Sequence, residues 1–406
     1  MTLYCISWAD RIIFYWTSSL TTGFAATLFM KTTTKIIIGV DARLAIECGR
    51  GWGRYATDFL LHMNKRSNIQ LKILLADSKS GRKLASRLID AEITFMKPHE
   101  SGHAGLAIQH SMQGLEITKL LGSIDIFHSL TRFVADINDV PVIATVHDIA
   151  PISVPPYKLQ FLAVSQLSIA KIIQNNIHLI AVSKFTKSEI IRFTSVPENK
   201  ISVIYQGNTF ASIRIDKASK VNDKAIKLLY VGGAGDNKNI MSLVECVKIL
   251  STHYKLELHL VGDNRWGYAE LRRNKTIYDH QGVAIIFHDL VSDRALSDLY
   301  TQCDVFVFPS LHEGFGLPVI EAMHHKTPVC CSDIAIMHEV AGDAAQYFSP
   351  SDPVSMAQTI KQVLNDQSLL NNMVVKGVAR SKKFKWDSCI SQTIDLYHHV
   401  IKNKER

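Results

Sequence analysis

From residue 36 onward, short apolar runs alternate with segments of helical periodicity, and no other feature constrains the fold as strongly. Continuous apolar runs separated by helices are typical of parallel strands that are buried on both faces. A first series of strands is expected at 36–40, 71–76, 126–128, 142–146, 179–182 and 203–205, with helices at 54–63, 162–173 and 187–193. A second series of strands is expected at 227–231, 256–261, 284–287, 305–308 and 329–331. The pattern predicts an α/β chain with two Rossmann-like domains whose parallel sheets face each other across a cleft.

The polar, aperiodic segment 207–224 separates the two series, so the domain junction is placed there. We expect an N-terminal extension at 1–34, a first domain at 35–206, a linker at 207–225, a second domain at 226–383 and a C-terminal helix at 384–406. A length of 406 residues agrees with two domains of ordinary size. Within the first domain, Thr186-x-x-Glu189 resembles a capping box for the helix 187–193.

The N-terminal extension allows two interpretations. Residues 12–30 carry no charge, but their threonines and serines disfavour insertion into a membrane. Met30-Lys31 directly precedes the first convincing strand, and we favour a native start at Met30 over a membrane anchor. Recovery of native peptides from upstream of Met30 by mass spectrometry would contradict that expectation.

The composition is globular and moderately basic, with a net charge of +8 and a pI near 9.0. Such a charge favours anionic partners, namely nucleotide diphosphates, acidic lipid headgroups or nucleic acid, and it does not choose among them. The seven cysteines are scattered and form no C-x-x-C pair, which favours free thiols in a reducing cytoplasm over disulfides or a zinc site: Cys5, Cys48, Cys246, Cys303, Cys330, Cys331 and Cys389.

Two basic clusters are present, and a solvated face is the simpler interpretation of each. The alternative is peripheral binding to an anionic membrane leaflet, which would suit a lipid-linked substrate. The clusters are Lys79, Arg82, Lys83 and Arg87 in the first domain, and Arg380, Lys382, Lys383 and Lys385 near the C-terminus.

The stretch 310–323 follows the apolar run 305–308 and reads S-L-H-E-G-F-G-L-P-V-I-E-A-M. It predicts a buried strand, a glycine-containing loop and a helix that Pro318 opens. A helix start presents unpaired N–H groups to a ligand and suits phosphate or sugar oxygens. Two carboxylates, Glu313 and Glu321, flank this start and can face the end of the strand. A helix start with two solvated glutamates is the alternative.

The strand 227–231 is followed by a glycine-rich segment that contains Gly233, Asn237 and Lys238. Glycine-rich backbone next to an ammonium group suits a diphosphate, with Lys238 as a point charge that offsets a departing nucleotide. A turn with one solvated lysine is the alternative. Arg265 is a further candidate cation of the same domain.

Polar residues also follow the strands of the first domain, where parallel sheets bind ligands. Asp41 and Arg43 follow the strand 36–40, and a helix then opens with Gly49-Arg50-Gly51-Trp52-Gly53-Arg54-Tyr55. Glycines there let the backbone approach a ligand closely, although a flexible turn fits equally well. His147-Asp148-Ile149-Ala150-Pro151 follows the strand 142–146. An imidazole beside a carboxylate can bind a sugar hydroxyl or a phosphate, and a structural pair is the alternative.

Taken together, these motifs resemble retaining glycosyltransferase family 4, which has the GT-B fold. The resemblance rests on the stretch 310–323, on the segments around His147 and Lys238, on 328–333 and 339–345, and on Phe384-x-Trp386 with Tyr397 as a helix that returns to the first domain. It covers roughly 36–397. Asp-Ala-Arg followed by Gly-x-Gly-Arg-Tyr is similar to a mannosyltransferase-like branch of the family.

The resemblance implies roles for individual residues. Glu313 would contact the donor sugar, Glu321 would accept hydrogen bonds from the nucleotide ribose, and His147 would lie near the donor sugar. Backbone amides near Phe315, Gly316 and Leu317 would face sugar and phosphate, and Ser310 joins them as a polar residue at a strand end. The chain departs from the family at Asn237, where an arginine usually stands. That departure puts the strength of diphosphate binding in doubt, and Arg265, Arg43, Arg50 or Arg54 could compensate.

The function implied is transfer of a hexose from a nucleotide-diphosphate sugar to a glycan or lipid-linked acceptor in surface polysaccharide (lipopolysaccharide-type) synthesis, in the cytoplasm or at the inner face of the membrane. GDP-mannose is the donor that this branch suggests. No cofactor is expected, and no nucleic acid is expected as a partner. The resemblance implies a reaction without a bound metal, and the lack of an Asp-x-Asp triplet in the chain agrees with this. A GT-B sugar-nucleotide epimerase and a non-catalytic nucleotide-sugar-binding protein are the alternatives.

Overall fold

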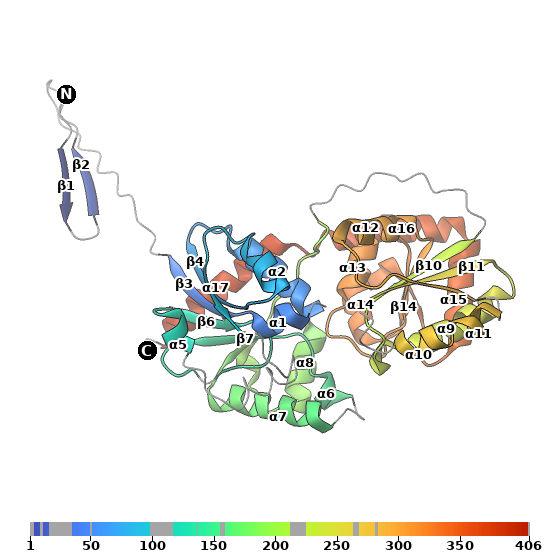
Figure 1. Ribbon diagram of the computed structural model, residues 1–406, viewed down its shortest axis with the longest axis horizontal. Helices are drawn as coiled ribbons and strands as arrows, with labels where there is room; N and C mark the ends of the chain where they lie inside the picture. The colour runs from blue at the N-terminus through green and yellow to red at the C-terminus, as the bar shows by residue number, and fades with distance from the viewer. Residues whose placement is uncertain are drawn as a thin grey trace, which may run out of the picture.

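The computed structural model describes residues 4–8, 11–15, 35–48, 51–97, 117–135, 137–154, 159–211, 225–262, 268–280 and 283–404. These residues form two α/β lobes that lie side by side (Figure 1). Near the N-terminus, β1 (Tyr4–Trp8) and β2 (Arg11–Tyr15) pair antiparallel. Most of the uncharged segment 12–30 lies outside the described residues. In the part of the chain that is described, no helix combines the length and hydropathy needed to cross a membrane.

The first sheet contains seven described strands, all parallel, in the order β5-β4-β3-β6-β7-β8-β9. Its central strands are buried along their whole length, as continuous apolar runs require. The strands are β3 (Ile36–Asp41), β4 (Ile69–Ala76), β5 (Glu92–Met96), β6 (Ile126–Ser129), β7 (Val142–Val146), β8 (His178–Ala181) and β9 (Ile201–Val203).

The second sheet contains six described strands, again all parallel, in the order β12-β11-β10-β13-β14-β15. They are β10 (Ile226–Val231), β11 (Leu256–Val261), β12 (Ala284–Phe287), β13 (Val305–Phe308), β14 (Val329–Ser332) and β15 (Ala345–Phe348). In both sheets the order of the strands turns back beside the first strand of the domain, β3 or β10, which is where open α/β sheets bind ligands. The expectation of two Rossmann-like domains is confirmed.

Helices cover both sheets. Those of the first domain are α1 (Arg43–Cys48), α2 (Gly51–Met63), α3 (Lys79–Ala85), α5 (Ile117–Leu121), α6 (Ala150–Ser153), α7 (Leu159–Gln174), α8 (Lys184–Phe193) and the 3₁₀ turn η1 (Glu198–Lys200). Those that follow are η2 (Asp236–Lys238), α9 (Ile240–Ser251), α10 (Tyr268–Arg273), α11 (Lys275–His280), α12 (Asp293–Gln302), α13 (Leu317–His324), α14 (Ala335–Ala341), η3 (Gly342–Ala344), α15 (Pro353–Asn365), α16 (Gln367–Ser381) and α17 (Trp386–Lys404).

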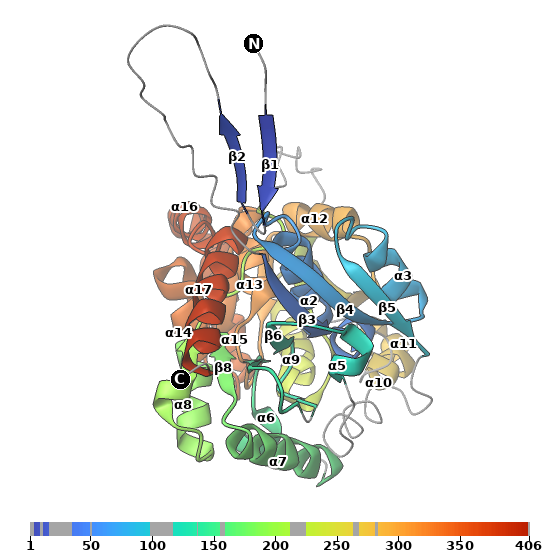
Figure 2. The ribbon, with the colours of Figure 1, turned by 90° about the vertical axis from the view of Figure 1, so that its left-hand side faces the viewer.

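The C-terminal helix α17 returns to the first domain, as expected. Its residues Trp386 and Tyr397 belong to the same apolar core as strands β3 and β4. The hydroxyl of Tyr397 also bonds Nδ1 of the fully buried His128 at 2.6 Å. In Figure 2, α17 and the edge formed by α3 and β5 lie on opposite sides of the first domain.

Three details of the sequence prediction are wrong. The strand expected at 203–205 is β9, which ends at Val203. The edge strands β5 and β15 were not predicted, and β5 is only partly buried, so it lacks the continuous apolar run of a central strand. Helix α8 begins at Lys184 and its N-cap is Ser183, whose Oγ accepts the N–H of Thr186 at 2.9 Å. Thr186 and Glu189 are therefore not a capping box.

The chain connects the two domains twice, through the linker that begins at Gly207 and again just before α17, and the two connections are in contact at Gly207. A Cβ atom added there would come 2.3 Å from Cγ of Trp386 and 2.5 Å from its backbone nitrogen. Asn208 also donates its N–H to the carbonyl of Phe384 at 3.0 Å. Glycine at 207 therefore allows the linker and the start of α17 to run side by side.

We predict that Gly207→Ala destabilises the protein by about 1–3 kcal/mol, because the backbone of Trp386 cannot yield to the methyl group as a side-chain end could. Gly51→Ala is the matched control, since nothing lies within 4 Å of its added Cβ atom and alanine is the better helix former. Thermal unfolding measures both variants. An unchanged melting temperature for Gly207→Ala would contradict this account of the crossing.

Candidate functional site

The loop after β13 begins the site. Strand β13 is buried throughout, and Ser310 just beyond it is fully buried, with no hydrogen-bond partner for its Oγ among the described residues. Gly316 has φ of 100°, which suits glycine, and it is the N-cap of α13, with Pro318 as the second helical residue. Phe315 and Leu317 on either side are buried. The loop thus leads from a rigid strand into a helix start whose N–H groups suit an anion.

Lys238 and Glu313 meet at this loop. Nζ of Lys238 lies 2.5 Å from Oε1 of Glu313, and their side chains are 24% and 13% exposed. An ammonium group has three N–H donors and a carboxylate has two acceptor oxygens, so each group can bind a ligand while it keeps the other. The two residues that the sequence suggested for phosphate and for sugar therefore form one unit.

Asn237 stands beside that unit and is held to the same loop. Its carbonyl accepts the N–H of Leu311 at 2.8 Å, and its Nδ2 lies 3.5 Å from the carbonyl of His312. The next residue, Asn239, has a left-handed backbone and donates Nδ2 to the carbonyl of Pro309 at 3.1 Å. These contacts fix η2, and hence Lys238, to the loop that carries Glu313.

His147 approaches the same loop from the first domain. Its Nε2 donates to the carbonyl of Leu130 at 3.1 Å, which leaves Nδ1 as the acceptor nitrogen of the neutral ring. Tyr55 packs edge-on against the ring, and Trp52 stacks on it. Burial lowers the pKa of His147 to about 4, although the bond to Leu130 and the charge of Asp148 oppose the shift. The ring is therefore neutral near pH 7, and its Nδ1 can accept a hydrogen bond from a hydroxyl group.

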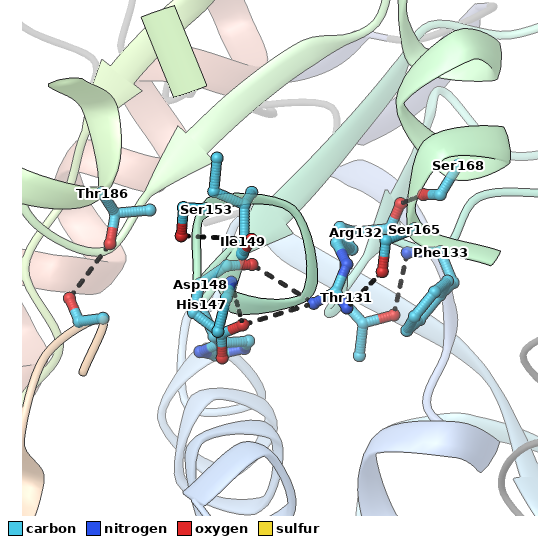
Figure 3. Close-up of polar contacts among 12 residues, drawn as sticks. Thr131, Arg132, Phe133, His147, Asp148, Ile149, Ser153, Ser165, Ser168 and Thr186 are labelled. Carbon is cyan, nitrogen blue, oxygen red and sulfur yellow. Dashed lines mark hydrogen bonds and ion pairs between the residues drawn. The ribbon is translucent and has the colours of Figure 1, made fainter. Parts of the chain in front are cut away.

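Arg132 supports the segment that follows His147 and was not predicted from the sequence. Its Nη1 donates to the carbonyl of Asp148 at 3.2 Å, and its Nη2 donates to Oγ of Ser165 at 3.0 Å (Figure 3). The carboxylate of Asp148 in turn accepts the N–H of Ala150 at 3.2 Å, at the start of α6. Asp148 thus shapes the turn after β7.

Arg54 and Glu321 meet across the two domains. Nε of Arg54, on α2, lies 3.2 Å from Oε1 of Glu321, on α13. The other oxygen of Glu321 accepts from the hydroxyl of Tyr300 at 2.9 Å. Burial raises the pKa of Glu321, and Arg54 acts against that shift. The ion pair is aligned too poorly for a hydrogen bond, and among the described residues Oε1 has no hydrogen-bond partner.

The remaining predicted residues are held by contacts of their own. Arg43 forms a buried two-pronged ion pair with Asp41, with Nη2 2.6 Å from Oδ2. Gly51 and Gly53 open α2, where Gly53 lies close to the carbonyl of Ala45. The carbonyl of Gly233 accepts from the hydroxyl of Tyr230 at 2.6 Å. Arg50 and Arg265 lie outside the described residues.

A second set of contacts between the domains was also missed. Nε2 of His312 bonds the carboxylate of Glu189 at 2.9 Å, and the carbonyl of Gly314 accepts from Ser183 and Thr186. The partners lie more than 120 residues apart in sequence, and no local pattern announces such pairs. The sequence pattern gave Thr186 and Glu189 a purely local role, as a capping box.

A lysine–carboxylate unit and a neutral histidine lie where the carboxyl ends of the two parallel sheets meet, which is where open α/β sheets bind ligands. Two family models match this chain: "Glycosyltransferase Family 4" over residues 51–208 and "Glycosyl transferases group 1" over residues 212–379.

Known proteins agree with these matches. The chain is 30% identical over 276 residues to O-antigen chain mannosyltransferase B of Escherichia coli. The matched region covers 63% of this chain and 69% of that protein. It is 34% identical over 238 residues to O-antigen chain mannosyltransferase RfbU of Salmonella typhimurium, covering 57% of this chain and 64% of that protein. The sucrose-phosphate synthase (tll1590) of Thermosynechococcus elongatus has the same fold, with a TM-score of 0.72, 17% identity and coverage of 91% of this chain and 100% of that chain.

The chain therefore belongs to glycosyltransferase family 4, and it is a glycosyltransferase. The five cysteines whose side chains are described are free and buried, as the sequence suggested: Cys246, Cys303, Cys330, Cys331 and Cys389.

We predict that the folded state loses stability as the pH falls from about 6.5, the ordinary pKa of histidine, towards 4. Burial lowers the pKa of His128 to about 3 and those of His147 and His325 to about 4. In this window the unfolded chain binds a proton at each of the three sites that the folded chain excludes. Each such histidine contributes a slope of about 1.4 kcal/mol per pH unit.

Urea unfolding between pH 4.5 and 7.5 measures this slope. His128→Asn is the comparison. It removes one buried ring, so it should reduce the slope by about 1.4 kcal/mol per pH unit, which is the contribution of one proton. A slope that is unchanged in the variant would contradict the assignment of a buried neutral ring to His128.

Proposed function

We propose that this glycosyltransferase moves a hexose, with mannose as the preferred candidate, from a nucleotide-diphosphate sugar to a glycan or lipid-linked acceptor in surface polysaccharide synthesis, with retention of anomeric configuration. The observation that carries the proposal is the Lys238–Glu313 unit at the start of α13, with the His147 segment opposite. The two curated relatives are named as O-antigen mannosyltransferases, which supports mannose and a polysaccharide product.

The chemistry divides between the two members of the unit. The acceptor hydroxyl attacks the anomeric carbon from the leaving-group face, the bond from that carbon to the phosphate oxygen breaks, and a phosphate oxygen takes the proton. Lys238 and the N–H groups at the start of α13 stabilise the departing diphosphate. The second oxygen of Glu313 accepts a hydrogen bond from one sugar hydroxyl, and Nδ1 of His147 accepts a hydrogen bond from another.

Glu321 suits the nucleotide ribose. Its Oε1 is buried beside Arg54 and lacks a hydrogen-bond donor among the described residues. A buried acceptor without a donor costs free energy, and a ribose hydroxyl would satisfy it. Tyr300 holds the other oxygen in place. Burial raises the pKa of Glu321, and the charge of Arg54 opposes that rise.

A panel of nucleotide sugars tests the function. We expect GDP-mannose to raise the melting temperature more than the UDP and ADP sugars do, and to transfer its sugar to a lipid-linked or glycan acceptor in the presence of EDTA. Nucleotide release that needs an acceptor separates a transferase from an epimerase and from a binding protein. Epimerised donor in the absence of acceptor, or binding without turnover, would overturn the proposal.

We predict different defects for the two glutamates. Glu313→Ala should abolish transfer, by at least about 100-fold, while GDP still binds, because the lost contacts are to the sugar. Glu321→Ala should weaken GDP by about tenfold, the equivalent of one charged hydrogen bond. Calorimetric titration with GDP and turnover of GDP-mannose measure the two effects, and near-normal turnover by Glu313→Ala would refute the site.

The outer edge of the first domain is the proposed membrane contact. Lys79, Lys83 and Arg87 are exposed there, and Ile89 and Phe95 beside them are 88% and 41% exposed. Basic residues with exposed apolar neighbours bind anionic lipid surfaces. The second basic cluster is smaller than the sequence suggested, because Arg380 donates to the carbonyls of Glu339 and Val340.

Co-sedimentation with liposomes tests this contact at low salt. We expect binding to vesicles that contain phosphatidylserine and none to pure phosphatidylcholine. Replacing Lys79, Lys83 and Arg87 by glutamate should abolish the binding, whereas replacing Lys382 and Lys383 should leave most of it. Failure of the wild-type protein to sediment with the anionic vesicles would remove the membrane from the proposal.

A further inference from the structure

The two neighbours of Glu313 are both held by helix α8 of the first domain. On one side, Nε2 of His312 bonds the two carboxylate oxygens of Glu189 at 3.0 and 2.9 Å. On the other side, the carbonyl of Gly314 accepts from Oγ of Ser183 at 2.7 Å and from Oγ1 of Thr186 at 3.0 Å. Glu313 therefore lies between two residues that are anchored in the opposite domain.

The three anchoring side chains share one face of α8. Ser183, Thr186 and Glu189 follow one another at intervals of three residues, which places them along one side of a helix. Figure 1 shows α8 at the boundary between the two lobes. The Gly314 side of the loop has no space to move toward the first domain, since an added Cβ would come 1.6 Å from the carbonyl oxygen of His147.

These contacts are buried, so solvent screens them little. Ser183 and Thr186 are fully buried, and Glu189 and His312 are each 7% exposed. Burial acts to lower the pKa of His312, but the hydrogen bond and charge of Glu189, with Asp148 and Glu313 nearby, outweigh it and raise the pKa. Removing one partner of a buried charged pair leaves the other uncompensated, and the loop would then adopt other positions.

We propose that Glu189, with Thr186 and Ser183, positions Glu313 for catalysis: α8 clamps residues 312 and 314, so the sugar-binding carboxylate is in place only while the two domains are in contact. The inference rests on the proposed role of Glu313 toward the donor sugar. Its consequence is that the acceptor-side domain completes the donor site. A donor bound to an open enzyme would not meet a correctly placed Glu313, which would limit loss of the sugar to water.

The structure offers a matched control on the same helix. The backbone N–H groups of Lys184 and Phe185 donate to the carboxylate of Glu339 at 2.7 and 2.8 Å, and Tyr205 donates to it as well. Glu339 lies on α14, and these hydrogen bonds of its carboxylate go to residues 184, 185 and 205 rather than to residues 312–314. Glu339→Gln therefore weakens the contact between the domains without removing a hydrogen bond that holds residues 312–314.

The kinetic test compares Glu189→Gln with Glu339→Gln, with GDP-mannose as donor and GDP as the sugar-free ligand. We expect Glu189→Gln to lower kcat about 10- to 100-fold, since a displacement of about 1 Å can cost that much, while the dissociation constant of GDP changes less than about twofold. Thr186→Val should act in the same direction and less strongly, because Ser183 still holds Gly314. Glu339→Gln should change kcat less than about threefold.

Hydrogen exchange of the peptide that spans 310–316 tests the clamp without any donor. We expect faster exchange there in Glu189→Gln and wild-type exchange in Glu339→Gln. If no nucleotide sugar is turned over by the wild-type protein, the proposed function fails and the exchange result alone decides the clamp. Unchanged exchange in Glu189→Gln overturns the proposal, and so do equal losses of kcat in Glu189→Gln and Glu339→Gln.

Discussion

The contact between Gly314 and the main chain of His147 sets how near the two sheets can lie. A side chain at position 314 would overlap the carbonyl oxygen of His147, so glycine is required for this approach. Both residues follow central, fully buried strands, β13 and β7, whose positions the two cores fix. The approach therefore brings the end of one sheet to the end of the other, with Glu313 and His147 in the region between them.

Three ion pairs hold charged residues that the sequence suggested for the site. Arg43 is bound to Asp41 within the first domain, Arg54 faces Glu321 between the domains, and Lys238 is bound to Glu313 within the second. A bidentate buried pair such as Arg43–Asp41 is costly to break, because each partner would be left uncompensated. Arg43 therefore stabilises the first domain. It is a poor substitute for the arginine that the family usually has where this chain has Asn237.

The sequence predicted the central strands well and the edges and long-range contacts poorly. Strands such as β7 and β13 are continuous apolar runs, because both of their faces are buried. Strand β5 is an edge strand with exposed positions, Phe95 among them, and its pattern does not stand out from a loop. Glu313, Glu321 and Lys238 could be proposed as site residues because they stand in recognisable local motifs. The contacts of α8 with the second domain could not be predicted. A helical pattern shows on which face Glu189 lies, but it does not show that Glu189 binds His312, 123 positions away.

The pairing of Lys238 with Glu313 means that their two proposed roles are not independent. Taken separately, one residue would serve the phosphate and the other the sugar. In the structure they form one ion pair, so under the proposed roles a diphosphate that binds Lys238 would also alter the charge that Glu313 presents to the sugar. Because Asn237 adds no charge, the proposed stabilisation of the diphosphate would draw on the N–H groups at the start of α13 beside Lys238. On the proposed roles, the strength of donor binding would depend on how firmly the loop 310–316 is held, and the first domain holds that loop through Ser183, Thr186 and Glu189. The same loop would then couple donor binding to contact between the domains.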